Sequence, residues 1–548
     1  MTRLVTPASS YADIYASFKW RIPKKCNIAA DVCDRHASDP TKVALIHHLP
    51  DRIQKYTFRM IQERANRLAN TLVALGLKQG DRVMINLGQH PVTAFSHVAC
   101  WKAGLISVPT STLFGVEGLE YRLNNSGAIV LITDSSNLHK ALEAQRNAPT
   151  LKHIFVVDGY EVEGALSLME TIAKASSKFK TLALTPDTPA FINYTSGTTG
   201  WPKGTLQGHR SMIGHMPGLE VLYDLFPQPQ DLLWSPADWS WLAGLMDVLM
   251  PAWFHGKPVL VFPMKEFDPE LSLSMMGRHQ VRNALLTPTM LKLFRPVGHL
   301  VADQNVQLRS IISGSEAVGK ELLLEMNSIF GVTINEGFGQ TECNVVLGNC
   351  ASLGCSKIGT LGVPMPGHIA GIVDDDGNLQ PNGKVGTLAF KRPDPVMLLE
   401  YWKDPEATKA KFAGDWLLTG DLASCDEEGF YSFFGRTDDV INSSGYRIGP
   451  GEIEDVIQHH PAVSLTAVIG VPDALRTETV RAYVVLAAGH LPSADLAEEI
   501  KVSVRNRLAK HEYPRDIVFV DSLPMTTTGK VLRRSLRDRA RLEADGTS

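Results

Sequence analysis

Short apolar runs alternate with segments of helical spacing in the first part of the chain. Arg82–Leu87, Ile106–Pro109 and Ala128–Thr133 are rich in apolar residues, and Val92–Ala103, between the first two, has the spacing of a helix. Strands that are apolar on both faces and alternate with helices predict a mainly parallel α/β sheet. The pattern recurs in three later runs, Lys152–Asp158, Val259–Pro263 and Leu308–Gly314.

The pattern changes after about Gly435. Two short predicted strands, Leu465–Val471 and Val480–Leu486, are followed by a predicted helix over Ala494–Ala509 and a further strand at Ile517–Val520. Strands and helices in this order predict a compact α+β module rather than a continuation of the parallel sheet.

Two domains follow from these patterns. We expect a large N-terminal α/β domain over residues 1–436, with mainly parallel sheets, and a small C-terminal α+β domain over residues 437–548. The polar segment 435–446 lies between the two patterns and is the candidate hinge.

Composition and charge exclude several classes of protein. The 548 residues are 44% hydrophobic and 20% charged, as expected of a folded chain with more than one domain. The formal net charge is -4, with no basic stripe of the kind that nucleic-acid binding requires. No apolar run reaches the roughly 18 residues of a membrane span, and the N-terminus has no apolar signal segment, so we expect a soluble cytoplasmic protein. The sequence does not decide between a monomer and a homodimer.

The seven cysteines favour a reducing compartment, since an odd number is spread over a long chain. Cys343, Cys350 and Cys355 are closest together, but their spacing matches no common zinc site. We therefore expect them to be small buried apolar side chains.

The segment Tyr194–Gly204, with the sequence YTSGTTGWPKG, has the composition of a phosphate-binding loop. Glycines let backbone N–H groups turn onto an anion, hydroxyls add donors, and a lysine adds positive charge. The loop follows a predicted strand at Ala190–Asn193, and α/β sheets bind ligands at such strand ends. It is not a Walker A loop, because Lys203 is followed by Gly204 rather than by Ser or Thr. The candidate phosphate-binding residues are Thr195, Ser196, Gly197, Thr198, Thr199, Gly200 and Lys203.

Four more motifs follow in order: NEGFGQTE at Asn335–Glu342, LLTGDL at Leu417–Leu422, GRTDDVINSSGYRIGPGEIE at Gly435–Glu454, and PMTTTGK at Pro524–Lys530. With the loop, they resemble the adenylate-forming superfamily of acyl-CoA synthetases, peptide-synthetase adenylation domains and firefly luciferase. PADWSW at Pro236–Trp241, the SSGYRIGPGEIE stretch and EYPRDIVFVDSLP near the C-terminus are most similar to medium-chain acyl-CoA synthetases.

The resemblance implies a two-step ligase that uses ATP, Mg²⁺ and CoA. A carboxylic acid is first joined to AMP with release of pyrophosphate, and the acyl group then passes to CoA. The phosphate loop would hold the β- and γ-phosphates, Thr341 the α-phosphate, and Glu342 with Thr198 the magnesium ion. Asp421 would accept both ribose hydroxyls, a sound pairing for a carboxylate. The resemblance implies an adenine site lined by Gly314, Ser315, Glu316, Glu336, Gly337, Phe338 and Gly339, with Gln340 also at the nucleotide. Arg436 would donate to the ribose, and Arg447 would contact the ATP side or the domain interface.

The resemblance gives the C-terminal domain a mobile role. Lys530 would lie against the α-phosphate during adenylation, where a fixed cation stabilises the developing charge. The domain would then rotate about Asp438 to form the CoA tunnel. The implied CoA contacts are Ser444, Gly445, Tyr446, Arg476, Arg505, Tyr513, Pro514 and Arg515.

The acid pocket is expected at Trp239, Gly339, Val345, Val346 and Gly348. Acetyl-specific relatives carry a tryptophan at the position of Gly339, so glycine indicates an acid larger than acetate. A medium-chain fatty acid is the first prediction, and an aryl acid such as a benzoate is the alternative. An enzyme that loads a carrier protein, a luciferase-like oxygenase and a non-catalytic nucleotide-binding regulator remain as competing interpretations.

Overall fold

The computed structural model describes residues 3–159, 163–195, 201–316, 318–374, 376–436, 439, 441–443, 446–473, 477–508, 513–525 and 531–544. Their contacts divide them into two compact units. The first holds the described parts of 1–195, 202–369 and 391–410, and the second holds those of 370–390 and 411–548, with Trp201.

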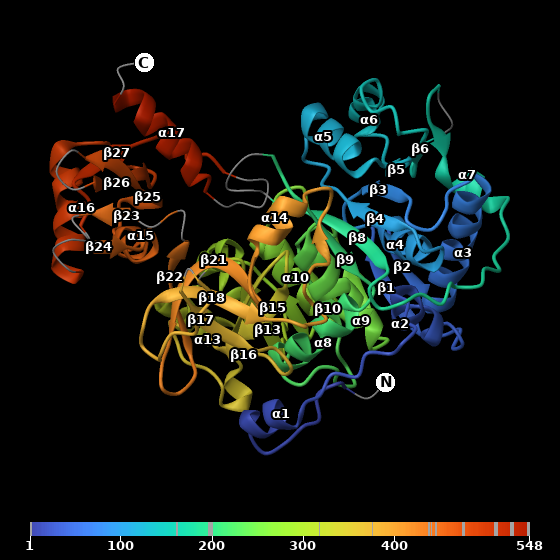
Figure 1. The fold of residues 1–548 in the computed structure, drawn as a ribbon, viewed down its shortest axis with the longest axis horizontal. Helices are drawn as coiled ribbons and strands as arrows, with labels where there is room; N and C mark the ends of the chain where they lie inside the picture. The colour runs from blue at the N-terminus through green and yellow to red at the C-terminus, as the bar shows by residue number, and fades with distance from the viewer. Residues whose placement is uncertain are drawn as a thin grey trace. The chain divides into compact units, whose positions relative to one another are not determined.

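The first unit contains a sheet of eight strands (Figure 1). They are β3 (Arg82–Asn86), β4 (Ile106–Pro109), β5 (Val130–Thr133), β6 (His153–Val156), β7 (Leu166–Ser167), β8 (Pro189–Tyr194), β9 (Gly204–Gly208) and β19 (Glu400–Tyr401). Their order is β19-β9-β8-β4-β3-β5-β6-β7. Neighbours from β8 to β7 are parallel, whereas β9 and β19 run antiparallel to their partners.

Helices cover both faces of this sheet. On one face lie α5 (Val116–Ser126) and α6 (Leu138–Gln145), which are neighbours in Figure 1 and share a core with the strands. On the other lies α4 (Pro91–Lys102), whose His97 ring nitrogen is 3.0 Å from the Ser107 hydroxyl. The residues that flank Ser107 on β4 belong to the core under α5 and α6, and successive side chains of a strand point to opposite faces. This double cover explains why the strands are apolar throughout.

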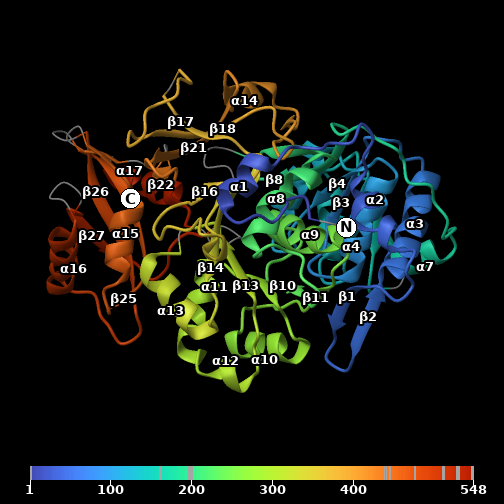
Figure 2. The same cartoon turned by 90° about the horizontal axis from the view of Figure 1, so that it is seen from below.

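A second sheet of the first unit has nine strands. They are β1 (Val43–His48), β2 (Ile53–Thr57), β10 (Leu233–Trp234), β11 (Val259–Val261), β12 (Asn283–Leu285), β13 (Ser310–Gly314), β14 (Ile334–Gln340), β15 (Asn344–Gly348) and β16 (Val363–Pro364). Their order is β16-β15-β14-β13-β12-β10-β11-β1-β2, with parallel pairing from β14 to β1 and antiparallel pairing at both edges. Figure 2 shows α10 (Pro269–His279), α12 (Leu300–Asp303) and α13 (Lys320–Phe330) beside it, and their apolar faces share one core with its strands.

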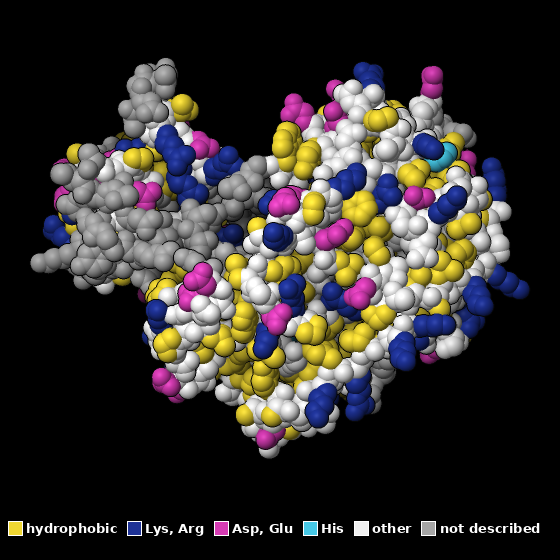
Figure 3. Space-filling model, in the orientation of Figure 1, with side chains coloured by type: hydrophobic (Ala, Val, Ile, Leu, Met, Phe, Trp, Pro, Cys, Tyr) yellow, Lys and Arg dark blue, Asp and Glu magenta, His cyan; other side chains and the backbone are white. Residues whose placement is uncertain are grey.

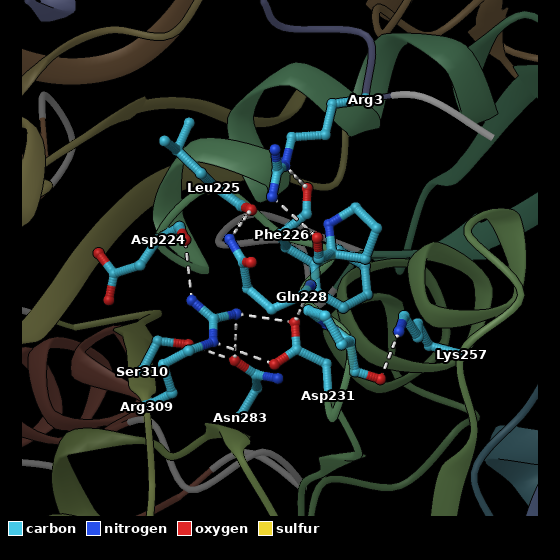
Figure 4. A network of polar contacts seen from close by, with 12 residues as sticks. Arg3, Asp224, Leu225, Phe226, Gln228, Asp231, Lys257, Asn283, Arg309 and Ser310 are labelled. Carbon is cyan, nitrogen blue, oxygen red and sulfur yellow. Dashed lines mark hydrogen bonds and ion pairs between the residues drawn. The ribbon is translucent and has the colours of Figure 1, made fainter. Parts of the chain in front are cut away.

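A polar network ties the strands together at their amino-terminal ends (Figure 4). Arg309 donates to the carboxylate of Asp231 at 2.8 Å, to the Asp224 carbonyl at 2.8 Å, and to the side-chain oxygen of Asn283 at 2.9 Å. Ser310 also donates to Asn283, at 2.7 Å. Asn283 and Ser310 are the first residues of β12 and β13, so the network fixes this end of the sheet and leaves the carboxyl end for ligands.

The described residues of the first unit also form nine further α- and π-helices, most of them short. They are α1 (Tyr11–Ser17), α2 (Ile28–Val32), α3 (Phe58–Ala74), α7 (Leu168–Ala173), α8 (Ser211–Leu222), η2 (Ala243–Leu249), α9 (Met250–Phe254), α11 (Pro288–Leu293) and α14 (Pro405–Ala410). On the face seen in Figure 3, basic and acidic side chains of this unit are interspersed with apolar ones.

The second unit has two sheets of five strands each. One consists of β17 (Ala370–Val373), β18 (Gly386–Lys391), β20 (Phe412–Ala413), β21 (Trp416–Cys425) and β22 (Tyr431–Arg436). The other consists of β23 (Ile441–Ser443), β24 (Tyr446–Ile448), β25 (Val463–Asp473), β26 (Thr477–Leu486) and β27 (Asp516–Phe519). Cores lie on both faces of the second sheet, one with α15 (Pro450–Gln458) and α16 (Ala494–Arg507), the other with α17 (Arg533–Ala544).

The predicted fold class is confirmed: a large N-terminal part with mainly parallel sheets precedes a small α+β part. The compact units do not divide at residue 436, because α15 packs against β22 and the sheet of β22 groups with the residues that follow. The functional boundary at 436 stays a prediction.

The buried interior contains the three clustered cysteines and a long apolar stretch. Cys343, Cys350 and Cys355 are buried, as predicted. The apolar stretch Trp241–Phe254 forms η2 and α9 within the core. No described helix combines the length and apolar character needed to cross a bilayer.

Candidate active site

The predicted phosphate loop joins two antiparallel strands of the eight-stranded sheet. β8 and β9 pair with Tyr194 opposite Gly204, and the Thr195 amide donates to the Lys203 carbonyl at 2.9 Å. A β-carbon on Gly204 would lie 2.7 Å from the Ile192 side chain, so this exit from the loop requires glycine. Both ends of the loop are thus fixed in a hairpin at the carboxyl end of β8. Ser196, Gly197, Thr198, Thr199 and Gly200 lie outside the described residues.

Two other predicted nucleotide-binding segments meet at the carboxyl end of the nine-stranded sheet. β13 and β14 are parallel, with Gly314 opposite Gly337, and a β-carbon on Gly314 would lie 2.6 Å from the Gly337 carbonyl oxygen. Beyond the strand, the Val318 amide donates to the Glu336 carboxylate at 3.1 Å, and burial raises the pKa of Glu336. The segments Gly314–Glu316 and Glu336–Gln340 are therefore neighbours, as a shared adenine site requires.

Thr341 and Glu342 lie in the turn between β14 and β15. The Thr341 carbonyl accepts a hydrogen bond from the Gln207 side chain of β9 at 3.1 Å, which links the turn to the phosphate-loop hairpin. The Glu342 carbonyl accepts from the Leu398 amide at 2.8 Å, and its carboxylate accepts from the Tyr401 hydroxyl at 2.5 Å. Glu342 is 8% exposed, so these bonds hold a buried acid in a defined orientation.

Lys203 reaches the same tyrosine from the phosphate loop. Its ammonium nitrogen lies 5.3 Å from the centroid of the Tyr401 ring, within the range of a cation–π contact. One aromatic ring therefore contacts both the cation of the phosphate loop and the acid predicted to bind magnesium.

The chemistry of Glu342 fits a magnesium ion. Carboxylate oxygens are hard donors, and Mg²⁺ is commonly held by one or two carboxylates together with substrate phosphates. The second predicted ligand, Thr198, lies outside the described residues.

A side chain at position 339 is excluded by the backbone of β15. A β-carbon on Gly339 would lie 1.7 Å from the Asn344 carbonyl oxygen and 2.8 Å from the Val345 amide nitrogen. Asn344 itself has a φ of 42°, which is uncommon for a residue other than glycine. Glycine at 339 thus has a backbone explanation, in addition to the pocket-size explanation suggested by the sequence.

Asp247 is a buried acid behind the same turn. It lies on η2, and its carboxylate accepts a hydrogen bond from the Asn344 side-chain amide at 2.6 Å. Burial raises the pKa of Asp247 to about 7, although the bond from Asn344 acts to lower it. Tyr223 donates to the Asp247 carbonyl at 3.1 Å. Asp247 therefore ties η2 to the residue that closes the turn of Thr341 and Glu342.

The predicted pocket residues belong to two neighbouring parts of the first unit. Trp239 precedes η2 and is 1% exposed. Val345, Val346 and Gly348 lie on β15, and a β-carbon on Gly348 would lie 2.7 Å from the Leu222 side chain of α8. All four residues lie in the buried interior, and their contact with an acid stays a prediction.

The two predicted ribose residues are paired in the second unit. Asp421 on β21 lies opposite Arg436 on β22, and the Arg436 guanidinium is 3.2 Å from the Asp421 carboxylate. The Asp421 amide donates to the Thr419 hydroxyl at 3.0 Å, and Thr419 donates to the Leu388 carbonyl at 2.7 Å. Asp421 is therefore held in position as a buried acceptor, 3% exposed, on a rigid strand.

The predicted CoA contacts are described only in part. The Arg515 guanidinium carbon lies 4.3 Å from the Tyr513 ring centroid, with a hydrogen bond to the Tyr513 hydroxyl, and Pro514 between them is buried. Arg505 is exposed on α16. Tyr446 and Arg447 belong to β24, but their side chains are not described. Asp438, Ser444, Gly445, Arg476 and Lys530 lie outside the described residues.

Three residues at the site were not predicted from the sequence: Tyr401, Asn344 and Asp247. Asp247 carries a visible signal, since it is an acid within a long apolar stretch. Tyr401 and Asn344 are ordinary polar residues in sequence, and only the pairing of strands brings them to Glu342 and Asp247.

Comparisons with known proteins find family models, relatives and a solved structure that match most of the chain. A family model described as AMP-binding enzyme matches residues 33–402, and one described as AMP-binding enzyme C-terminal domain matches residues 452–530. The acetyl-coenzyme A synthetase of Bacillus subtilis is 34% identical over 96% of this chain and 94% of its own length. The mitochondrial acyl-coenzyme A synthetase ACSM4 of Mus musculus is 32% identical, over 94% and 91%.

A solved structure agrees over almost the whole chain. The anthranilate CoA ligase AuaEII, in complex with anthranoyl-AMP, superimposes with a TM-score of 0.86 and 29% identity. The match covers 96% of this chain and 99% of that chain.

Proposed function

The chain belongs to the family of AMP-binding enzymes and is an AMP-forming acyl-CoA ligase; from that premise we propose that it activates a medium-chain fatty acid. The acid's carboxylate oxygen attacks the α-phosphorus of ATP, and pyrophosphate leaves. The CoA thiol then attacks the acyl carbonyl of the adenylate, and AMP leaves. Catalysis of the first step depends mainly on positioning and on stabilising negative charge.

We assign separate residues to the phosphates and to the ribose of ATP. The phosphate loop with Lys203 binds the phosphates that leave, and Thr341 binds the α-phosphate. Glu342 would hold a magnesium ion, which would supply positive charge beside the phosphates. Asp421 accepts the ribose hydroxyls, and Lys530 stabilises the charge at the α-phosphate. The fixed hairpin ends at Thr195 and Lys203 and the anchored carboxylate of Glu342 support these roles, because such geometry limits reorganisation during the reaction.

The second step uses the C-terminal residues. We assign CoA binding to the segment around Ser444–Tyr446 and to Arg505 and Arg515, since guanidinium groups bind phosphate with paired donors. Arg515 stacks on Tyr513, which gives this cation a defined position in the second unit.

The absence of a side chain at residue 339 is the observation that carries the proposed acid. In acetyl-specific relatives a tryptophan at this position shortens the pocket. Here the Asn344 carbonyl occupies the space that a β-carbon would need, so β14 presents only backbone at this point. This supports our proposal of an acid longer than acetate, and the motifs shared with medium-chain synthetases favour a fatty acid.

An aryl acid is the second candidate, favoured by the similarity to the anthranilate ligase. A carrier protein as acyl acceptor is less well supported, since the curated relatives reported above are coenzyme A synthetases. The odd number of cysteines, seven spread over a long chain, suits a reducing compartment, and we propose the cytoplasm as the location.

Acid specificity is measured as kcat/KM for acyl-CoA formation across acetate, butyrate, hexanoate, octanoate, dodecanoate and benzoate. Each methylene in an apolar pocket contributes about 1–3 kcal/mol, so we expect octanoate or hexanoate to exceed acetate by about a hundredfold or more. A maximum at benzoate would replace the fatty acid with the aryl candidate. A maximum at acetate would contradict the argument from residue 339.

A further inference from the structure

We propose that Tyr401 is a positioning residue for adenylation: its hydroxyl orients the Glu342 carboxylate, and its ring holds the Lys203 ammonium group in position. This rests on the proposed function, which assigns Glu342 to magnesium and Lys203 to the leaving phosphates. Tyr401 would then set the distance between the Glu342 carboxylate and the Lys203 ammonium group, which act on the same polyphosphate.

Backbone hydrogen bonds link the segment around Tyr401 both to the exit of the phosphate loop and to the turn that contains Glu342. In β19, Tyr401 pairs with Thr205 of β9, and the next residue, Trp402, donates its amide to the Gly204 carbonyl at 2.7 Å. Just before β19, the Leu398 amide donates to the Glu342 carbonyl at 2.8 Å. The strand is thus fixed to the exit of the phosphate loop on one side and to the turn of Glu342 on the other.

The hydroxyl bond orients the acid. The Tyr401 hydroxyl donates a hydrogen bond to one carboxylate oxygen of Glu342, with 2.5 Å between the two oxygens. Tyr401 is 6% exposed and Glu342 is 8% exposed, so this bond is largely shielded from water. Fixing one carboxylate oxygen restricts the orientation of the whole carboxylate group, which the proposed function assigns to a cation. Groups that orient a metal ligand in this way commonly change metal affinity when they are removed.

The Tyr401 ring makes the second contact, with the positively charged ammonium group of Lys203. Lys203 lies 5.3 Å from the ring centroid, and the electron-rich face of a tyrosine attracts an ammonium group. The contact narrows the range of positions that a flexible lysine side chain can occupy. The two contacts use different parts of one side chain, so substitutions can separate them.

Tyr401→Phe keeps the ring and its burial but removes the hydroxyl. We expect the Mg²⁺ concentration needed for half-maximal ATP binding, measured by calorimetry without acid or CoA, to rise about tenfold or more. ATP binding without Mg²⁺ is expected to be unchanged. Tyr401→Leu removes the ring as well, and we expect it also to weaken Mg²⁺-free ATP binding about two- to fivefold.

Tyr15→Phe is the matched control, since the Tyr15 hydroxyl donates to a backbone carbonyl, that of His368, at 2.8 Å. It is expected to keep the wild-type Mg²⁺ requirement. Melting temperatures recorded without ligand show whether each variant is folded. A folded Tyr401→Phe with the wild-type Mg²⁺ requirement would overturn the inference alone. If the wild-type protein bound no ATP at any Mg²⁺ concentration, that result would instead contradict the proposed function.

Discussion

Lys530→Ala is expected to slow acid-dependent pyrophosphate release by at least about a hundredfold, the usual effect of removing one preorganised group from a charge-stabilising site. The lysine would face the α-phosphate only while the adenylate forms. Transfer of the acyl group from a supplied acyl-adenylate to CoA is therefore expected to continue at a rate comparable to that of the wild type. The two half-reactions are measured separately, as pyrophosphate release and as acyl-CoA formation.

Lys78→Ala is the control for this substitution, because Lys78 is an exposed lysine whose hydrogen bond to Asp81 is donated by its backbone amide. It is expected to leave both half-reactions unchanged. Lys530→Arg keeps the charge but not the compact ammonium group, and we expect it to restore adenylation only in part. Equal loss of both half-reactions in Lys530→Ala would contradict a role confined to adenylation.

Gly339→Ala is expected to lower the free energy of unfolding by about 3 kcal/mol, at the upper end of what an added methyl group costs in a packed interior. The new β-carbon would lie 1.7 Å from the Asn344 carbonyl oxygen, so β14 and β15 must move apart. The same two strands carry the turn of Thr341 and Glu342, and a shift of about 1 Å at a catalytic group can cost about a hundredfold in rate. We therefore expect kcat/KM to fall for every acid, acetate included.

Gly115→Ala is the matched control, because a β-carbon there meets nothing within 4 Å. Chemical unfolding and kcat/KM for acetate and octanoate are measured for both variants. A stable Gly339→Ala that loses octanoate but keeps acetate would show that glycine serves pocket size alone. That result would contradict the backbone explanation.

The strands of the first unit were predictable because burial on both faces makes them apolar from end to end. β4 runs over the predicted residues, Ile106–Pro109, and β3 ends one residue before the predicted Leu87. β8 and the phosphate loop that follows it were predictable for a related reason, since a glycine- and hydroxyl-rich segment after an apolar run has few other uses. Local composition predicted a strand or a loop correctly where its residues alone determine its structure.

The residues that contact and position the predicted site residues could not be predicted in this way. Tyr401 contacts Glu342 and Lys203 because β19 pairs with β9, and nothing near Tyr401 in the sequence marks that pairing. Asn344 on β15 and Asp247 on η2 are far apart in sequence, and only the tertiary fold brings them to hydrogen-bond distance. The backbone reason for Gly339 also needed the structure, because the sequence shows a missing side chain but not what occupies its place.

The most direct test of the account is the dependence of pyrophosphate release on acid and CoA. The wild-type enzyme is given ATP and Mg²⁺, with and without octanoate and with and without CoA, and pyrophosphate, AMP and acyl-CoA are quantified. The account predicts sustained turnover only when both acid and CoA are present, with the three products formed in equal amounts. Pyrophosphate release that stops at about one equivalent per enzyme, whether or not CoA is added, would contradict it, since such a burst marks a bound intermediate that CoA does not discharge.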